Sequence, residues 1–408
     1  MSCSEWREVK LEDIIQFNSR ENIVKKQIAK KIAMEKLKPF NKTIEGYEYA
    51  EFKGGTKFRN GDTLLARITP CLENGKTAQV SILNEDEVGF GSTEYIVLRE
   101  KPNKSVNDFI YYLAISPRFR DIAIKSMIGT SGRQRVQQDV LENTSIPIPP
   151  LSEQKAIAAT LSCLDDKIEL NNRINKTLEE MAQVIFKSWF VDFEPFQDGE
   201  FEDSELGRIP KGWRVGTIGE FVKEMKNGGT PSRKNDSYWN SKDVPWIKTG
   251  EIKNSLIIES EEYISCEGLK NSSAKVLPYN SILMAMYGAT AGQIGLLKFK
   301  ASTNQACCAM ICISANKAVF LYLYLLANQS YIESLAVGAA QQNLSKDTIS
   351  KLRLIIPKDE VIETAIFDEL FNSIERNFRE TQKLNAVRNS LLPKLMSGEI
   401  RVPIEEVQ

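Results

Sequence analysis

Residues 147–196 carry the apolar repeat of a helix that packs along its length against another helix. Apolar side chains recur at alternating steps of four and three residues, at Ile157, Leu161, Leu164, Ile168, Leu178, Ala182, Ile185 and Trp189. This spacing is a heptad seam. Prolines precede it, and Ser152 is expected to cap the first helical turn. A helix of about 35 residues would be about 50 Å long, and its apolar stripe needs a partner helix.

Two positions of the seam hold asparagine, Asn171 and Asn175. A buried asparagine can fix the register of a coiled coil at some cost in stability. Alternatively, the helices splay at this point and both amides face water. The adjacent acids Asp165 and Asp166 lie on the charged face of the predicted helix, where ordinary solvated carboxylates are expected.

The chain contains one pattern twice, displaced by about 210 residues. Trp6 and Trp213 each open a strand-like segment, and an Ile-Pro pair closes each copy at residues 146–147 and 356–357. A second apolar repeat follows the second copy, at Leu370, Ile374, Leu384 and Leu391, and Pro393 is expected to kink or end it. The duplication therefore predicts a globule, a helix, a second globule and a second helix, which is the partner of the first.

The expected boundaries follow from this duplication. Residues 1–150 form the first globular domain and residues 151–197 the first long helix. An acidic linker and the second globular domain take residues 198–357, and the second long helix takes residues 358–408.

The composition excludes several kinds of active site. The 408 residues include no histidine, which removes Ser-His and Cys-His nucleophilic sites and nearly all catalytic zinc sites. The seven cysteines form no CxxC pair, as is typical of reduced thiols in a cytoplasm. A signal pattern and a membrane-length apolar run are both absent, so a cytoplasmic protein is expected. No GxxxxGK[ST] or Rossmann glycine loop is present, so no metal or cofactor is expected in this chain.

A net charge of −1 argues against a uniformly basic nucleic-acid binder, so such binding would use local patches. Residues 20–42 carry eight Lys or Arg and two Glu. A solvated helix over residues 24–37 is one interpretation of this segment, and a set of DNA phosphate contacts is the other.

Glycine-bounded polar loops remain as candidate functional sites. Their Arg, Asn and Gln side chains carry the hydrogen-bond patterns that read base edges, Arg to guanine and Asn or Gln to adenine. In the first copy the candidates are Arg67, Asn74, Lys76, Arg133, Gln134 and Arg135. In the second copy they are Thr290, Gln293, Gln341, Gln342, Asn343 and Lys346. Equivalent loops with different side chains indicate two readers of different sequences, although a loop that merely caps a helix would look similar.

Several motifs resemble one known family. The stretch IPIPPLSEQKAIAATLSCLDDKIELNNRI is similar to the central conserved region of specificity subunits of type I restriction-modification enzymes, and LLPKLMSGEIRV to their C-terminal conserved region. LARITPCLENGKTA, GTSGRQRV, IPKGW and GATAGQIG resemble their target recognition domains. The resemblance covers essentially the whole chain.

This resemblance implies an α+β fold with two mixed α/β target recognition domains, separated by two long helices that pack as an antiparallel coiled coil. Each domain would read half of a split DNA site, and the helices would set the distance between the halves. The chain would be non-catalytic and would dock two methyltransferase subunits and the restriction and translocase subunits. Those partners would bind S-adenosylmethionine, ATP and Mg.

Two other classes of function compete with this one. An enzyme with its own methyltransferase domain would need a cofactor loop and an Asn/Asp-Pro-Pro-aromatic motif, and neither occurs. A coiled-coil scaffold that binds no DNA explains the helices, but not two equivalent domains with polar loops.

Overall fold

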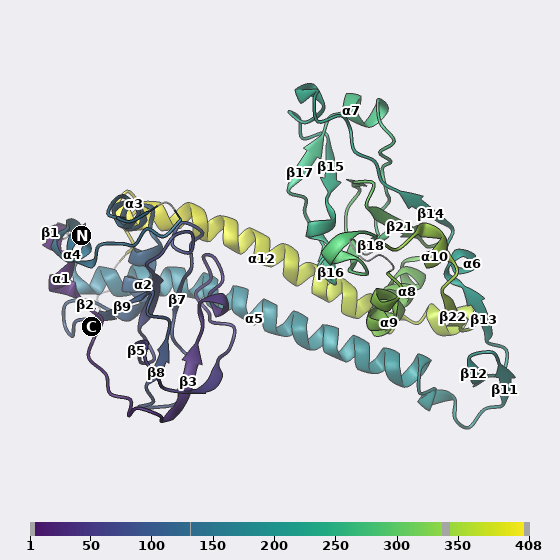
Figure 1. Ribbon diagram of the computed structural model, residues 1–408, viewed down its shortest axis with the longest axis horizontal. Coiled ribbons are helices and arrows are strands. Elements are labelled where there is room, and N and C mark those ends of the chain that lie inside the picture. Colours follow the sequence, from purple (N-terminus) through teal and green to yellow (C-terminus); the bar gives the residue numbers. More distant parts are fainter. Residues whose placement is uncertain (1–4, 131, 337–342, 404–408) are drawn as a thin grey trace. The chain divides into compact units, whose positions relative to one another are not determined.

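The computed structural model describes residues 5–130, 132–336 and 343–403 (Figure 1). The chain divides into two compact units. Unit 1 comprises residues 1–170 and 381–408, and unit 2 comprises residues 171–380. Each unit holds one globular domain and part of both long helices, α5 (Leu151–Phe190) and α12 (Ala365–Ser397).

The domain of unit 1 contains two four-stranded sheets, ordered β2-β9-β6-β7 and β4-β3-β8-β5. Its strands are β1 (Arg7–Lys10), β2 (Ile15–Phe17), β3 (Ile28–Ile32), β4 (Glu48–Glu51), β5 (Thr56–Phe58), β6 (Thr63–Ala66), β7 (Thr77–Gln79), β8 (Gly89–Gly91), β9 (Tyr95–Glu100) and β10 (Ser145–Ile148). Its helices are α1 (Leu11–Ile14), η1 (Met34–Lys36), α2 (Asn107–Ile115), α3 (Pro117–Lys125) and α4 (Gln138–Asn143).

The domain of unit 2 contains a five-stranded sheet, β14-β21-β18-β19-β16, and a three-stranded sheet, β17-β15-β20. Its strands are β11 (Phe201–Ser204), β12 (Gly207–Pro210), β13 (Arg214–Thr217), β14 (Glu224–Asn227), β15 (Val244–Ile247), β16 (Ser255–Ile257), β17 (Glu262–Ile264), β18 (Ile282–Ala285), β19 (Ile294–Leu297), β20 (Ser302–Thr303), β21 (Cys307–Ile311) and β22 (Arg353–Ile356). Its helices are η2 (Glu194–Phe196), α6 (Ile218–Phe221), η3 (Asp236–Tyr238), η4 (Thr249–Glu251), α7 (Cys266–Lys270), η5 (Gly288–Thr290), α8 (Ala315–Ala327), α9 (Gln329–Ser334), α10 (Lys346–Ser350) and α11 (Asp359–Ile362).

The duplication is visible in how each domain is closed. In unit 1, β1 pairs antiparallel with β10, so that Arg7 lies opposite Ile148. In unit 2, β13 pairs with β22 in the same way, and Arg214 lies opposite Ile356. In each copy the closing strand leads toward a long helix. The predicted fold class, two mixed domains and two long helices, is confirmed.

The two long helices run antiparallel. As residue numbers increase along α5, the numbers of the contacting residues on α12 decrease. In unit 1, Asp165 pairs with Arg388. In unit 2, the amide of Asn175 donates to the carbonyl of Ile374 at 3.3 Å and accepts from Asn377 at 2.8 Å.

The residues predicted to form the seam are buried or half-buried. Ile157, Leu161, Ile168 and Ile374 are buried, and Leu164, Leu178, Ile185, Leu370, Leu384 and Leu391 are half-buried. Asn171 and Asn175 are buried as well, so they do not face water. The side chain of Asn171 donates to Glu380 at 2.9 Å. The polar seam positions of one helix therefore find polar partners on the other.

Three expectations about local structure are wrong, and for Pro393 one of the two alternatives, that it ends the helix, is excluded. Residues 24–37 form strand β3 and the single turn η1 rather than a helix, because β3 pairs with both β4 and β8. Ser152 is the second residue of α5 and not its cap. Pro393 lies inside α12, which continues to Ser397. Asp165 is 6% exposed rather than solvated, because Arg388 and Tyr112 surround its carboxylate.

Candidate nucleic-acid interface

The polar loops predicted in the first domain lie side by side. The loop of residues 67–76 follows β6, and the loop of residues 132–137 precedes α4. The backbone N–H of Val136 donates to the carbonyl of Arg67 at 2.9 Å, and that of Thr69 donates to the carbonyl of Gln134 at 3.0 Å. An isolated β-bridge joins Ile68 to Arg135. These backbone contacts bring all six candidate residues of this copy onto one pair of loops.

Side chains fasten the first of these loops to the domain. Lys76 donates to the carbonyl of Met34 at 3.0 Å, so this ammonium group anchors the loop. The buried guanidinium of Arg120 donates to the carbonyl of Leu72 at 2.8 Å and lies over the ring of Phe40. Asn74 is exposed at the tip of this loop.

Arg135 is held by a carboxylate. Its Nε lies 3.0 Å from both oxygens of Glu94, and its Nη2 donates to Oε1 at 2.7 Å. The hydrogen bond from Arg135 lowers the pKa of Glu94 despite partial burial, and the nearby charge of Arg67 acts in the same direction. Glu94 raises the pKa of Arg135 in turn. Two guanidinium groups thus flank one carboxylate, while Arg133 on the same loop is exposed.

The second domain brings its loops together in the same way. The backbone N–H of Leu344 donates to the carbonyl of Met286 at 2.8 Å, and a β-bridge joins Tyr287 to Asn343. Thr290 and Gln293 lie on the loop after β18, where the N–H of Gln293 donates to the carbonyl of Thr290 at 2.9 Å.

Two further candidates of the second domain lie just before α10 and at its first residue. Asn343 is exposed, and Lys346 donates to the carbonyl of Met225 at 2.7 Å. The predicted residues Gln341 and Gln342 lie outside the described residues.

Corresponding positions in the two loop pairs carry different chemistry. The bridge between Ile68 and Arg135 corresponds to the bridge between Tyr287 and Asn343. The backbone N–H of Arg67 donates to the carbonyl of Glu94, and at the corresponding place that of Met286 donates to the carbonyl of Ala306. The first domain therefore has an Arg–Glu pair where the second has Asn343 and Ala306.

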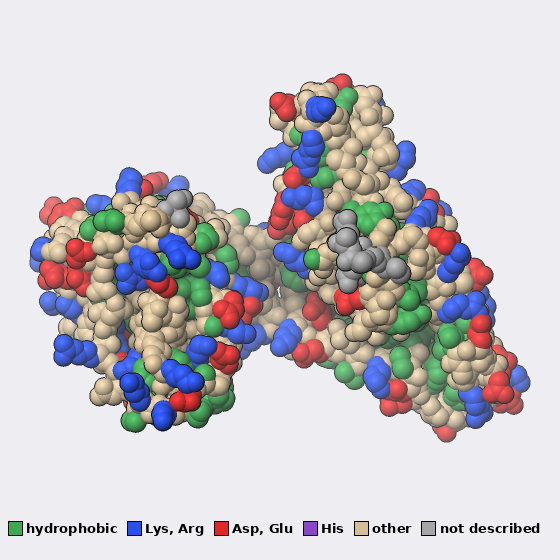
Figure 2. Space-filling model, in the orientation of Figure 1, with side chains coloured by type: hydrophobic (Ala, Val, Ile, Leu, Met, Phe, Trp, Pro, Cys, Tyr) green, Lys and Arg blue, Asp and Glu red, His purple; other side chains and the backbone are tan. Residues whose placement is uncertain are grey.

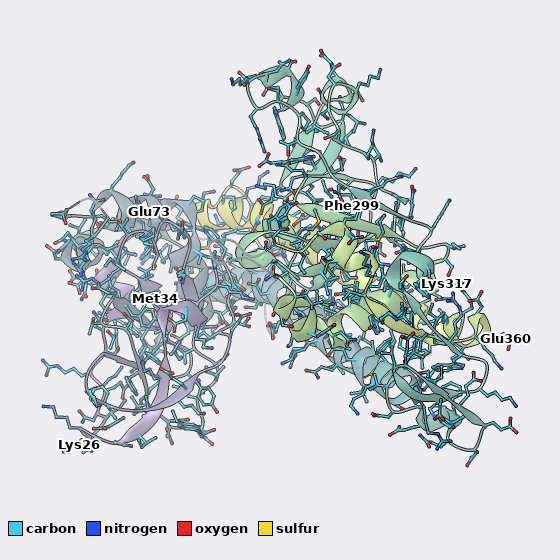
Figure 3. The ribbon with its side chains drawn as sticks, turned by 45° about the vertical axis from the view of Figure 1, so that its right-hand side comes forward. Lys26, Met34, Glu73, Phe299, Lys317 and Glu360 are labelled. Atoms are coloured by element: carbon cyan, nitrogen blue, oxygen red, sulfur yellow. The ribbon has the colours of Figure 1, made fainter. Side chains whose placement is uncertain are left out.

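Several of the eight cations of the basic segment 20–42 pair with acids of the same domain. Lys30 pairs with Glu87, Lys31 with Glu48 and Lys42 with Asp108, each within 3.0 Å. Figure 3 shows Lys26, in this segment, and Glu73, on the loop after β6, at opposite ends of the first domain. The segment as a whole is therefore not part of the paired-loop surface.

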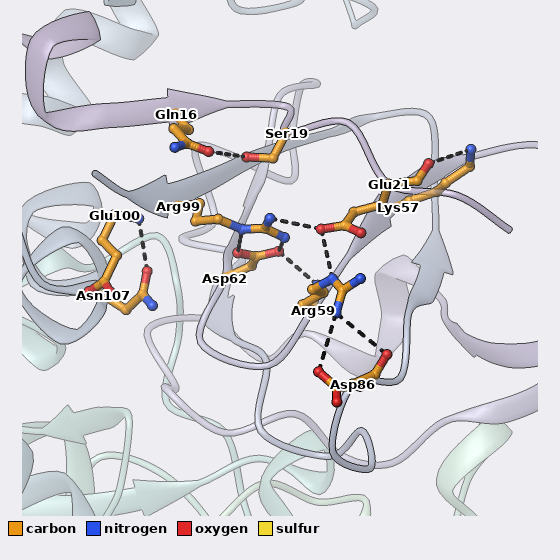
Figure 4. Close-up of polar contacts among 10 residues, drawn as sticks. All are labelled: Gln16, Ser19, Glu21, Lys57, Arg59, Asp62, Asp86, Arg99, Glu100 and Asn107. Carbon is orange, nitrogen blue, oxygen red and sulfur yellow. Dashed lines mark hydrogen bonds and ion pairs between the residues drawn. The ribbon is translucent and has the colours of Figure 1, made fainter. Parts of the chain in front are cut away.

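Other charges form internal networks. Arg99 clamps Asp62 through Nε and Nη2 at 2.6 and 2.7 Å, and Arg99 and Arg59 share the carboxylate of Glu21 (Figure 4). Figure 2 shows Lys and Arg interspersed with Asp and Glu on the visible face, in keeping with local patches rather than one continuous basic surface.

Two kinds of feature are absent from the residues that the structure describes. These residues contain no group of three or more Cys, Asp or Glu side chains arranged to hold a metal ion. Among the same residues, no helix combines the length and apolar character needed to cross a membrane.

The two copies seen in the structure also match one family model twice. The model of the type I restriction modification DNA specificity domain matches residues 3–180 and residues 210–389. The chain belongs to this family. A specificity subunit of the HindI enzyme of Haemophilus influenzae is 29% identical, over 84% of this chain and 87% of its own length. The MjaIX specificity subunit of Methanocaldococcus jannaschii is also 29% identical, over 73% of this chain and 70% of its own length.

A solved structure agrees with this assignment at the level of the fold. The type I restriction-modification S subunit of M. genitalium superposes with a TM-score of 0.60 at 16% identity, covering 96% of both chains. The chain is thus a type I specificity subunit by family.

The sequence reasoning missed three residues of the interface region. Glu94 was not among the candidates, because it lies 41 residues from Arg135 in the sequence. Arg120 and Met34 support the loop after β6 from distant segments, and no local pattern marks them.

Proposed function

We propose that this chain is the non-catalytic specificity subunit of a type I restriction-modification complex and reads a split DNA site. One domain would read each half of the site through its pair of polar loops. The chain would act in the cytoplasm.

The correspondence of the two loop pairs carries this proposal. Both domains join a loop after a central strand (β6 or β18) to the loop before a short helix (α4 or α10). The scaffold is therefore shared, while the exposed side chains differ, as two readers of different sequences require.

The helix pair would serve as a spacer between the half-sites and as a dock for the partner subunits. Helix α5 has 40 residues, so it is about 60 Å long at ~1.5 Å per residue. The partners, methyltransferase subunits and restriction or translocase subunits, would bind S-adenosylmethionine, ATP and Mg. The duplication lets one chain offer equivalent surfaces to two identical partners.

Single-molecule sequencing of methylated adenines tests this function. Cells that express this chain with its methyltransferase partner should show one split motif, and cells that lack only this chain should show none. The same methylation pattern without this chain would contradict the proposal.

A binding titration separates the proposal from a scaffold that binds no DNA. The complex with the methyltransferase should bind DNA with an affinity that falls steeply as salt rises, because phosphate contacts release counterions. A complex without salt-dependent DNA affinity would favour the scaffold.

A further inference from the structure

We infer that Arg135 reads a guanine in the half-site of the first domain and that Glu94 is the residue that positions it. This inference rests on the proposed function and adds to it the identity of one reading side chain and one recognised base.

The geometry of the ion pair leaves the reading edge of Arg135 available. Glu94 takes the side edge of the guanidinium, formed by Nε and Nη2. The end of the fork, Nη1 with the second hydrogen of Nη2, has no hydrogen-bond partner among the residues that the structure describes. Two parallel N–H donors at this end match O6 and N7 of guanine in the major groove.

Arg135 also has the exposure that a reader needs. Its side chain is 43% exposed and that of Glu94 is 24% exposed, so the pair lies at the surface with the carboxylate on the inner side. The backbone beneath Arg135 is fixed by bridges to Ile68 and Ile128. A guanidinium held at its base by a carboxylate loses less side-chain freedom on binding than a free one.

Arg67 keeps the local charge positive. Its Nε is buried and has no hydrogen-bond partner among the described residues, and its charge acts on Glu94. Arg67 and Arg135 carry two positive charges against the one negative charge of Glu94. The carboxylate can therefore orient Arg135 without making the surface repel DNA phosphates.

The second domain lacks this arrangement. Asn343 stands at the position of Arg135, and Ala306, which carries no carboxylate, stands at the position of Glu94. An asparagine amide matches adenine rather than guanine. The guanine contact is therefore expected in one half-site only, which gives the test an internal control.

The test uses the whole chain in complex with its methyltransferase partner. The methylated motif is determined for the wild type, Arg135→Lys and Glu94→Gln. Arg135→Lys keeps the charge but loses the two-pronged donor, so one guanine position of one half-site should relax by about tenfold to a hundredfold. The other half-site should not change.

Glu94→Gln separates positioning from simple loss of structure. Removing the negative charge should lower discrimination at the same guanine while raising the affinity for non-specific DNA. A variant that only damaged the domain would lower both.

Arg99→Lys is the matched control. Arg99 makes the same side-on pair with Asp62 but lies near the opposite end of β9 from Glu94. This variant should leave the motif unchanged.

A chemical probe checks the contacted atom. Replacing the guanine of a synthetic site by 7-deazaguanine removes the N7 acceptor. It should weaken binding of the wild-type complex by about tenfold and leave Arg135→Lys almost unaffected.

The outcomes distinguish the inference from the proposed function. A split wild-type motif that Arg135→Lys leaves unchanged, or changes at a base other than guanine, would overturn the inference alone. If the wild type gave no split motif, the proposed function would fail and the inference with it.

Discussion

The two ends of the helix pair are packed with different chemistry, although the duplication places corresponding residues at both. Ile157 and Leu161 of α5 correspond to Phe367 and Phe371 of α12, each pair being 210 residues apart (367 − 157 and 371 − 161). All four side chains are buried in the cores of their own units. The contacts around these side chains differ between the two units.

In unit 1, charged pairs hold the helices together. Arg388 of α12 donates to Asp165 of α5 at 2.5 Å, and both side chains are less than 10% exposed. The hydroxyl of Tyr112, from α2, donates to the same carboxylate at 2.7 Å. Arg401 pairs with the buried Glu153, which also accepts from the indole of Trp6.

In unit 2, aromatic rings fill the corresponding place. Phe190 of α5 lies 4.9 Å from Phe320 of α8 and 6.0 Å from both Phe367 of α12 and Trp213, measured between ring centroids. Phe186 packs against Phe190 and Phe320. These contacts are apolar and involve no ion pair.

An acid at corresponding positions of the two units has different partners in each. Glu375 corresponds to Asp165 (375 − 165 = 210), but the cation beside it is a lysine of the domain of unit 2 rather than an arginine of the other long helix. Tyr279 donates to it, and the buried Lys298 lies 3.5 Å away. The same helical backbone therefore accommodates an ion pair in unit 1 and an aromatic cluster in unit 2. These two kinds of packing are expected to respond differently to substitution.

The largest effect is expected from Arg388→Met. It leaves the carboxylate of Asp165 buried without its cation, which costs about 3–5 kcal/mol. Hydrogen exchange of α2 and of the adjoining helix segments in urea would measure this loss within unit 1.

The matched control removes both charges. Asp165→Leu combined with Arg388→Met should recover most of the stability, to within about 2 kcal/mol of the wild type. The hydroxyl of Tyr112 keeps a contact with Ser162 at 3.3 Å. A double variant as unstable as Arg388→Met alone would show that the charges are not the cause.

A smaller loss, about 1–3 kcal/mol at neutral pH, is expected from Glu375→Gln, because Lys298 is then buried beside a neutral partner. Burial already lowers the pKa of Lys298 in the folded protein. The unfolded chain therefore binds more protons above that lowered pKa, and stability rises as pH increases toward the ordinary lysine value near 10.4. The loss in Glu375→Gln should therefore shrink as pH rises toward that value. Urea unfolding at several pH values checks this, and a loss that stays constant or grows as pH rises would contradict the role of the buried lysine.

The smallest effect is expected from Phe190→Leu. A leucine of similar volume keeps most apolar contacts and loses the ring pairs, so the cost should be about 1–1.5 kcal/mol. This loss of stability should not vary with pH or salt. Segment-resolved hydrogen exchange of α8 would measure it. A loss above about 3 kcal/mol would mean that the aromatic end is no more tolerant than the charged end.

The fold was largely accessible from the sequence because its main signals are periodic. The heptad stripe and the repeat at about 210 residues depend on spacing alone, and both predict the helix pair and the two domains. The recurrence of a glycine-bounded polar loop in each copy was also predicted, but its pairing with the loop after β6 or β18 was not.

What escaped prediction depends on partners that are distant in sequence. Asp165 looked solvated because Arg388 lies 223 residues away. The segment 24–37 looked helical because its cations suggested a solvated face, whereas pairing with β4 and β8 makes it a strand. Glu94 acquires its role only when Arg135 is brought beside it by the bridge to Ile68.

The central claim, two readers held at a set distance by the helix pair, is tested most directly by lengthening both helices together. One heptad is inserted after Ile168 in α5 and one after Leu384 in α12, which leaves the pairing of Asp165 with Arg388 and of Asn171 with Glu380 intact. The insertion adds about 10 Å, so the gap in the methylated motif should grow by at most about three base pairs with both half-sites unchanged. Altered half-sites, or an unchanged gap in a methylating complex, would contradict the account.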